Sequence, residues 1–136
     1  MTAAKPVYVL DACALLRLAQ DEAGADRVAD ILIRAANCEH RVLLHQINLG
    51  EVAYRIGKRH GWAVAERKCA EIARLPVEIV AFTDGLFWEA VRLKAAYPMA
   101  YADCFAAALA IREQAWLLTS DPEFEVLGDA VARIKV

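Results

Sequence analysis

The sequence predicts an α/β fold in which a central, mostly parallel sheet of about five strands is flanked by helices on both faces. Two observations support this prediction: short apolar runs typical of buried strands recur along the chain, and segments of helical composition separate them. Such alternation favours a parallel sheet, because each parallel connection needs a crossover that a helix can provide. With 136 residues, of which 59% are hydrophobic, the chain has the size and core content of one domain, which we expect to span residues 1–136.

The first third of the chain carries two strand signals and two helical ones. Val7–Leu10 is a short β-rich run that ends at an acidic residue, and residues 12–20 follow with helical composition. After a glycine, apolar residues recur at helical spacing over residues 25–38. Residues 41–45 contain the apolar run VLL, which predicts a second buried strand.

The middle of the chain predicts two helices, a strand and a third helix. Residues 47–60 indicate one helix, and a second extends over residues 61–74, where a proline stops it. The run VEIVAF at residues 77–82 predicts the third strand. Asp84 is the expected N-cap of a helix that continues to Ala96.

The last third contains an alanine-rich helix and two strands. The helix is predicted over residues 102–113, and the run AWLLT at residues 115–119 predicts the fourth strand. Asp121 followed by proline indicates a turn or short helix, because proline is favoured at the first helical position. After Gly128, residues 131–136 predict a fifth strand.

Composition excludes several classes of protein. A formal net charge of −2, from 16 Lys and Arg against 18 Asp and Glu, argues against a polycationic nucleic-acid binder. The apolar stretch at residues 105–111 is too short to span a bilayer, and an acid at position 11 interrupts any signal-peptide core. We therefore expect a cytoplasmic protein that does not associate with membranes.

The cysteines show no metal-binding pattern. No two lie within a C-x-x-C spacing, and no Cys and His pair has the spacing of a zinc finger. A chain of this size without a signal segment does not need disulfides. We expect four reduced, mostly buried side chains that act as small apolar groups, namely Cys13, Cys38, Cys69 and Cys104.

Four acids fall at or near the carboxyl ends of predicted strands. Asp11 ends the first strand, Glu51 lies early on the helix after the second, Asp103 lies in the first turn of the alanine-rich helix, and Asp121 follows the fourth strand. Ligands gather at this edge of a parallel sheet. Four unpaired carboxylates would repel one another there, and hard oxygen ligands favour Mg²⁺ or Mn²⁺ over zinc. The sequence therefore predicts a divalent metal site.

Each acid also has a purely structural explanation. Asp11 and Asp121 are placed to act as N-caps, and Asp103 is placed to complement a helix dipole. Asn48 and Glu51 have the spacing of a capping box. The four acids together support a metal site more strongly than any one of them does alone.

Four segments carry a family resemblance. In chain order, VYVLDACALLRLAQDE, QINLGEVAYRIGKRHG, YADCFAAALAIREQA and WLLTSDPEF resemble the successive motifs of PIN-domain ribonucleases, and among these the VapC-type toxins of bacterial toxin–antitoxin pairs. The resemblance implies a single PIN-like α/β/α sandwich. It places the family's catalytic, metal-binding acids on Asp11, Glu51, Asp103 and Asp121.

Three further positions match the family less strictly. Thr119 matches its site threonine, Asn48 a frequent asparagine before the glutamate, and Glu123 a further acid that some members carry. Two positions depart from it: Cys13 stands where Ser, Thr or Asn is usual, and His45 where Ser or Thr is common. Neither departure changes one of the four acids, so the two departures bear only on the tuning of the site.

The resemblance also implies an activity and partners. It implies hydrolysis of RNA phosphodiester bonds with Mg²⁺ or Mn²⁺ as cofactor, in which the acids hold the ion and activate a water. It further implies a homodimer and a cognate antitoxin that inhibits the toxin. An RNA substrate needs local cations, and the densest basic stretch contains Arg55, Lys58 and Arg59. The alternative for this stretch is an ordinary solvated helix face with Trp62 in the core.

Other functions remain open at this point. One is a catalytically silent PIN-like interaction module, and another is an RNA-processing nuclease that belongs to no toxin system. A phosphotransfer protein is disfavoured, because Cys13 stands where a second Asp is needed and Lys135 lies within the last strand rather than after it.

Overall fold

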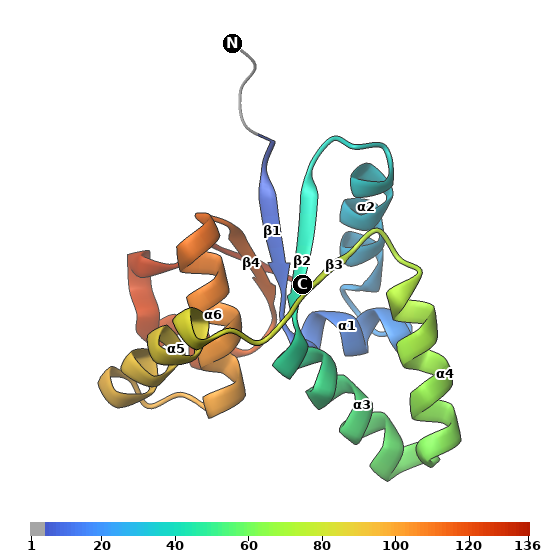
Figure 1. Ribbon diagram of the computed structural model, residues 1–136. Coiled ribbons are helices and arrows are strands. Elements are labelled where there is room, and N and C mark those ends of the chain that lie inside the picture. The colour runs from blue at the N-terminus through green and yellow to red at the C-terminus, as the bar shows by residue number, and fades with distance from the viewer. Residues whose placement is uncertain (1–4) are drawn as a thin grey trace.

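The structure of the chain is a computed structural model that describes residues 5–136. Five strands form one sheet in the order β3-β2-β1-β4-β5, and all pairings among the described residues are parallel. Helices cover both faces of this sheet (Figure 1). The α/β/α architecture predicted from the sequence is therefore confirmed, with a sheet that is parallel throughout these residues.

The elements alternate along the chain as the sequence predicts. The strands are β1 (Val7–Leu10), β2 (Arg41–His45), β3 (Glu78–Val80), β4 (Trp116–Thr119) and β5 (Arg133–Lys135). The helices are α1 (Ala12–Ala19), α2 (Ala25–Ala36), α3 (Gln46–His60), α4 (Trp62–Ala73), α5 (Asp84–Ala96), α6 (Tyr101–Glu113) and the 3₁₀ helix η1 (Pro122–Ala130).

Two cores lie on the two faces of the sheet. Successive strand residues point to opposite faces, so Val9, Leu43 and Leu117 pack with α5 and α6 on one face. Their neighbours Leu10, Leu44 and Leu118 pack with α1 to α4 on the other. Figure 1 shows the two helical layers on opposite sides of the strands. Burial on both faces explains why the central strands are continuous apolar runs without polar alternation.

The strand order reverses at the carboxyl end of β1, the position at which parallel sheets of this kind have their ligand-binding crevice. From β1 the chain builds outward through β2 and β3 on one side, and β4 and β5 lie on the other. Ligands of such sheets bind where this order reverses. The helices α3 and α6 contact each other at this point. Asp11 follows β1 directly, so it lies in the middle of the reversal.

Most element boundaries lie within about two residues of the sequence prediction, but the start of α5 and the extent of β3 differ in ways that have a physical reason. The N-cap of α5 is Thr83, whose Oγ1 accepts a hydrogen bond from the amide of Leu86, and Asp84 is the first helical residue. The strand β3 covers only Glu78–Val80, where residues 77–82 were predicted. Within the described residues β3 pairs with β2 alone, and a strand with one neighbour has fewer hydrogen bonds to extend it.

The cysteines are free, as predicted, but they are less buried than expected. Only Cys104 is buried, while Cys13 and Cys69 are half-buried and Cys38 is exposed. Cys38 ends the segment after α2 with a positive φ of 59°, a turn geometry that lies at the surface. None of the helices formed by residues 5–136 combines the length and the apolar character that crossing a membrane requires.

Candidate metal centre

Asp11 is both a helix cap and a member of the acidic site. Its backbone is extended, and its Oδ1 accepts a hydrogen bond of 2.8 Å from the amide of Ala14 in the first turn of α1. Its Oδ2 accepts a short hydrogen bond from the hydroxyl of Thr119. Only 2% of the residue is exposed. The capping explanation is thus correct for Asp11, but it leaves the carboxylate at the crevice.

Thr119 joins the ends of two strands. While its hydroxyl donates to Asp11, the same oxygen accepts a hydrogen bond of 3.0 Å from the amide of Asp121. Asp121 in turn caps η1, because its Oδ1 accepts a hydrogen bond of 2.9 Å from the amide of Glu123. Proline at the first position of η1 suits this cap. The site threonine therefore sets the position of both aspartates.

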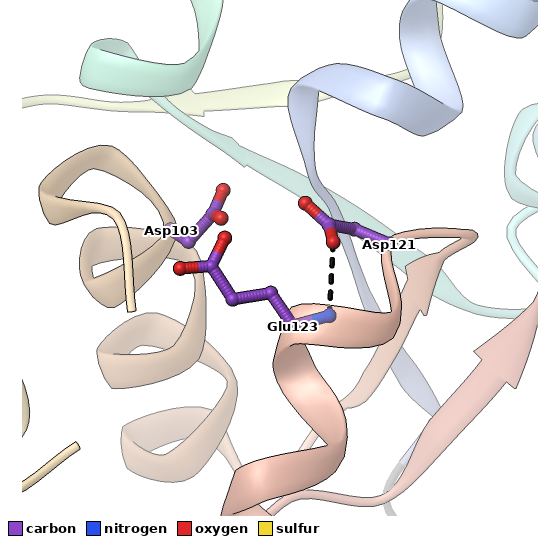
Figure 2. A group of neighbouring side chains, drawn as sticks. All are labelled: Asp103, Asp121 and Glu123. Carbon is purple, nitrogen blue, oxygen red and sulfur yellow. Dashed lines mark hydrogen bonds between the residues drawn. The ribbon is translucent and has the colours of Figure 1, made fainter. Parts of the chain in front are cut away.

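Asp103, Asp121 and Glu123 form the most compact acidic group. Each offers one carboxylate oxygen, and these oxygens lie within 4.8 Å of one another. Figure 2 shows Asp103 projecting from α6 toward the other two side chains, which come from the start of η1. A carboxylate oxygen of Glu123 also accepts a short hydrogen bond from the amide of Ala100, at the N-cap of α6. Glu123, a secondary candidate in the sequence, thus lies at the centre of the site.

Glu51 approaches this group from α3. It is 8% exposed, and its Oε1 accepts a hydrogen bond of 3.0 Å from Nδ2 of Asn48. Its Oε2 faces the guanidinium of Arg55 at 3.4 Å. Asn48 also donates to the backbone carbonyl of Ala102, the residue before Asp103. Asn48 therefore links the two helices that carry Glu51 and Asp103.

The capping-box explanation of Asn48 and Glu51 is wrong. The helix α3 begins at Gln46, and its N-cap is His45, whose Nδ1 accepts a hydrogen bond of 3.0 Å from the amide of Ile47. Asn48 consequently lies inside the first turn, with its side chain turned to Glu51 and α6. A histidine ring acting as the cap gives little signal in the sequence, since Ser, Thr, Asp and Asn are the usual caps.

Burial and mutual repulsion perturb two of the acids. Burial raises the pKa of Asp103 to about 8, assisted by a hydrogen bond to Glu123 and by the negative charges of Glu51, Asp121 and Glu123. Burial also raises the pKa of Asp11 to about 6, although the hydrogen bonds from Thr119 and Ala14 oppose this rise. Asp121 and Glu51 add to it. The five acids therefore share one electrostatic environment.

The basic residues of α3 lie beside the acids and at the surface. The side chain of Arg55 is 45% exposed and pairs with Glu51. Lys58 places its Nζ 5.8 Å from the centroid of the Tyr54 ring, and Arg59 is exposed. Trp62 is 60% exposed, so the alternative that placed its ring in the core is wrong.

The comparisons with known proteins identify the family. The sequence pattern of the PIN domain matches residues 8–130. The chain belongs to the PIN domain family. The resemblance seen in the four sequence motifs is thereby confirmed. A search of curated protein sequences finds no significant match.

Several solved structures share this PIN-domain fold. A VapBC2 structure from Rickettsia felis, bound to a promoter DNA fragment, has 18% identity and a TM-score of 0.75, covering 95% of this chain and 98% of that one. VapBC-1 from nontypeable Haemophilus influenzae has 18% identity and a TM-score of 0.71, covering 95% and 97%. VapC20 from Mycobacterium tuberculosis, a toxin that cleaves the sarcin–ricin loop, has 16% identity and a TM-score of 0.67, covering 90% and 95%.

The residues of this PIN-domain site fit a divalent cation. The donor set consists of carboxylate oxygens, which suit Mg²⁺ and Mn²⁺. Burial, and after it the negative charges of neighbouring acids, raises the pKa values of Asp11 and Asp103, and a bound cation would favour their charged forms. In addition, Oδ1 of Asn48 is buried without a hydrogen-bond partner among residues 5–136.

Proposed function

We propose that this PIN-domain protein is a Mg²⁺- or Mn²⁺-dependent endoribonuclease that hydrolyses phosphodiester bonds of RNA. The observation that carries the proposal is the convergence of Asp103, Asp121 and Glu123, with oxygens within 4.8 Å of one another. Glu51 and Asp121 lie close enough to both Asp11 and Asp103 that their charges help to raise the pKa of each. A fold that keeps five carboxylates together at the crevice of a parallel sheet favours cation chemistry over a structural role.

Different residues would have different roles in the reaction. Asp103, Asp121 and Glu123 would hold the ion, with Asp11 and Glu51 as further ligands. The bound ion would lower the pKa of a water and stabilise negative charge on the phosphate. Asp103 or Asp121 would accept the proton of the attacking water. Thr119 keeps the carboxylates of Asp11 and Asp121 in position through its hydroxyl.

RNA would approach along the exposed side of α3. Arg55, Lys58 and Arg59 are exposed there, one to about two turns beyond Glu51. Their cationic groups would contact phosphates, which supply much of the affinity for nucleic acid. Arg55 offsets the charge of Glu51 through their ion pair. When a metal ion binds Glu51 instead, the exposed guanidinium of Arg55 would be free to contact a phosphate.

We further propose that the protein is the toxin of a toxin–antitoxin pair and that a cognate antitoxin inhibits it. The toxin would form a homodimer and act in the cytoplasm, with residues 1–136 as one domain. Support comes from the VapBC structures that share its fold. VapC20, with the same fold, is itself a toxin that cleaves RNA of the sarcin–ricin loop.

Cleavage of RNA by the purified protein tests the enzymatic proposal. We expect cleavage with Mg²⁺ or Mn²⁺, none after chelation with EDTA, and a loss of at least about 100-fold in Asp103→Asn. The matched control is Asp30→Asn, which neutralises an exposed aspartate paired with Arg34 on α2 and should cleave normally. Undiminished cleavage by both Asp11→Asn and Asp103→Asn would overturn the assignment.

A catalytically silent module is the second candidate, because Asp11 and Asp121 do serve as helix caps. Calorimetry with Mn²⁺ separates the two functions. A silent module would show no heat of binding that depends on the carboxylates, whereas the nuclease would lose its binding heat in Asp103→Asn.

A further inference from the structure

Asn48 is fully buried between two helices of the candidate metal centre. It lies on α3 with 0% of its surface exposed. Its Nδ2 donates to Oε1 of Glu51 at 3.0 Å and to the carbonyl oxygen of Ala102 at 3.1 Å. Because both partners are acceptors, only the nitrogen of the amide can face them. The orientation of this side chain is therefore defined by its surroundings.

This amide connects residues that are far apart in the sequence. Ala102 directly precedes Asp103, and it lies 54 residues beyond Asn48. One side chain thus holds an oxygen of Glu51 and the first turn of α6 at the same time. The N-cap of α6 is Ala100, which has no polar side chain to define the start of that helix. The contact with Asn48 supplies a constraint that the helix does not provide itself.

The other end of the amide has no partner within residues 5–136. Only two buried side-chain atoms in this part of the chain lack one, namely Oδ1 of Asn48 and Nε2 of His45. The ring of His45 lies against the ring of Phe105, with centroids 5.0 Å apart, so its surroundings are aromatic. The amide of Asn48 instead lies beside the acids. A buried acceptor that stays unpaired is unfavourable, so this orientation of the amide depends on the two hydrogen bonds that its Nδ2 donates to Glu51 and Ala102.

We propose that Asn48 is the positioning residue of the metal centre. It acts by holding Glu51 against the first turn of α6, so that this carboxylate points to the acids of the other helix. Hydrogen bonds of this kind orient metal ligands, and their removal typically lowers metal affinity about 10- to 100-fold. The inference rests on the proposed function, since it assumes that the acids bind a divalent cation.

A double-mutant cycle on Mn²⁺ affinity tests this role without measuring cleavage. Calorimetry would compare the wild type with Asn48→Ala, Glu51→Ala and the double variant. We expect Asn48→Ala to bind Mn²⁺ about 10- to 100-fold more weakly. Because Asn48 acts through Glu51, the loss in the double variant should fall at least about tenfold short of the product of the two single losses.

Two controls separate positioning from a general loss of stability. Thr83→Ala removes the cap of α5, a helix that carries none of the five site acids, so it should lower the unfolding temperature and leave Mn²⁺ affinity unchanged. Asn48→Ser serves if Asn48→Ala does not fold. Its hydroxyl is too short to span Glu51 and Ala102 together, and we expect the same loss of affinity.

The outcomes distinguish this inference from the proposed function. If the wild type binds no Mn²⁺, or if Asp103→Asn binds it equally well, the proposed function fails. If wild-type binding depends on Asp103 but Asn48→Ala and Asn48→Ser bind within about twofold of the wild type, only the role of Asn48 fails. Losses in the double variant that multiply to within about twofold would likewise overturn it.

Discussion

The acidic centre has two halves that are held in different ways. In the strand-end half, formed by Asp11, Thr119 and Asp121, both carboxylates accept backbone hydrogen bonds as helix caps. In the helix half, formed by Asn48, Glu51 and Asp103, contacts between α3 and α6 set the positions. The pKa is raised to about 6 at Asp11 and to about 8 at Asp103.

This difference shows how local hydrogen bonds influence the pKa of a buried carboxyl group. Hydrogen bonds from Thr119 and Ala14 favour the charged form of Asp11 and limit the rise in its pKa. At Asp103 the hydrogen bond to Glu123 and the nearby charges act in the same direction as burial, so its charged form is disfavoured. Both acids therefore lower the stability of the folded protein when they are charged, and Asp103 does so more strongly than Asp11.

The largest change in stability should come from neutralising Asp103. Its folded pKa of about 8 exceeds the reference of 3.8, so between these values the folded state binds more protons than the unfolded state. Stability of the metal-free protein must then fall as the pH rises through that window. Asp103→Asn should remove this dependence and be more stable than the wild type at pH 8, by urea unfolding in EDTA. A wild type whose stability rises from pH 5 to pH 8 more steeply than that of the variant would contradict this.

Addition of Mn²⁺ should stabilise the folded protein, because a bound cation offsets the charge of the buried acids. At about 100 times its dissociation constant, a ligand that binds only the folded state stabilises it by about 2.7 kcal/mol. Thermal unfolding should show such a gain for the wild type and little or none for Asp103→Asn. An equal shift in both proteins would place the ion elsewhere.

Removal of the carboxylate from the strand-end half should stabilise the protein less than neutralising Asp103 does. Asp11→Ala deletes the cap of α1 and leaves the hydroxyl of Thr119 without its acceptor. The lost cap costs about 1–2 kcal/mol and offsets the relief from no longer burying a carboxylate whose pKa is raised to about 6. Urea unfolding at neutral pH in EDTA compares Asp11→Ala with Asp103→Asn, with Asp30→Asn as the exposed reference. A free energy of unfolding for Asp11→Ala as high as that of Asp103→Asn would erase the distinction between the halves.

The smallest effect concerns the basic residues that extend the helix half along α3. Charge reversal at Lys58 and Arg59 should leave folding nearly unchanged, because both side chains are exposed. It should weaken RNA binding and reduce the slope of log K against log salt by about 0.7 for each phosphate that the protein no longer neutralises. Binding to a catalytically inactive Asp103→Asn background, titrated at several salt concentrations, gives this slope. An unchanged slope would show that Lys58 and Arg59 do not contact RNA phosphates.

The prediction from sequence succeeded where the signal was local. Asp11 and Asp121 were predicted as possible caps and as site residues, and the structure shows the caps and places both at the crevice. It failed where a cap was unusual, since His45 begins α3 and Thr83 caps α5. The sequence also contains no sign that Glu123 lies beside Asp103, because their proximity joins segments 20 residues apart. Whether these acids bind a metal stays a prediction.

The order of strands and helices, and the acids that follow β1 and β4, could be predicted from the sequence, because apolar periodicity, caps and proline act over a few residues. Which of the acids lie close together depends on the packing of distant segments. The strand order β3-β2-β1-β4-β5 brings α3 beside α6, and Asn48 then reaches the carbonyl of Ala102. The physical reason is that burial, repulsion and a shared amide depend on distances between segments, which no local pattern encodes.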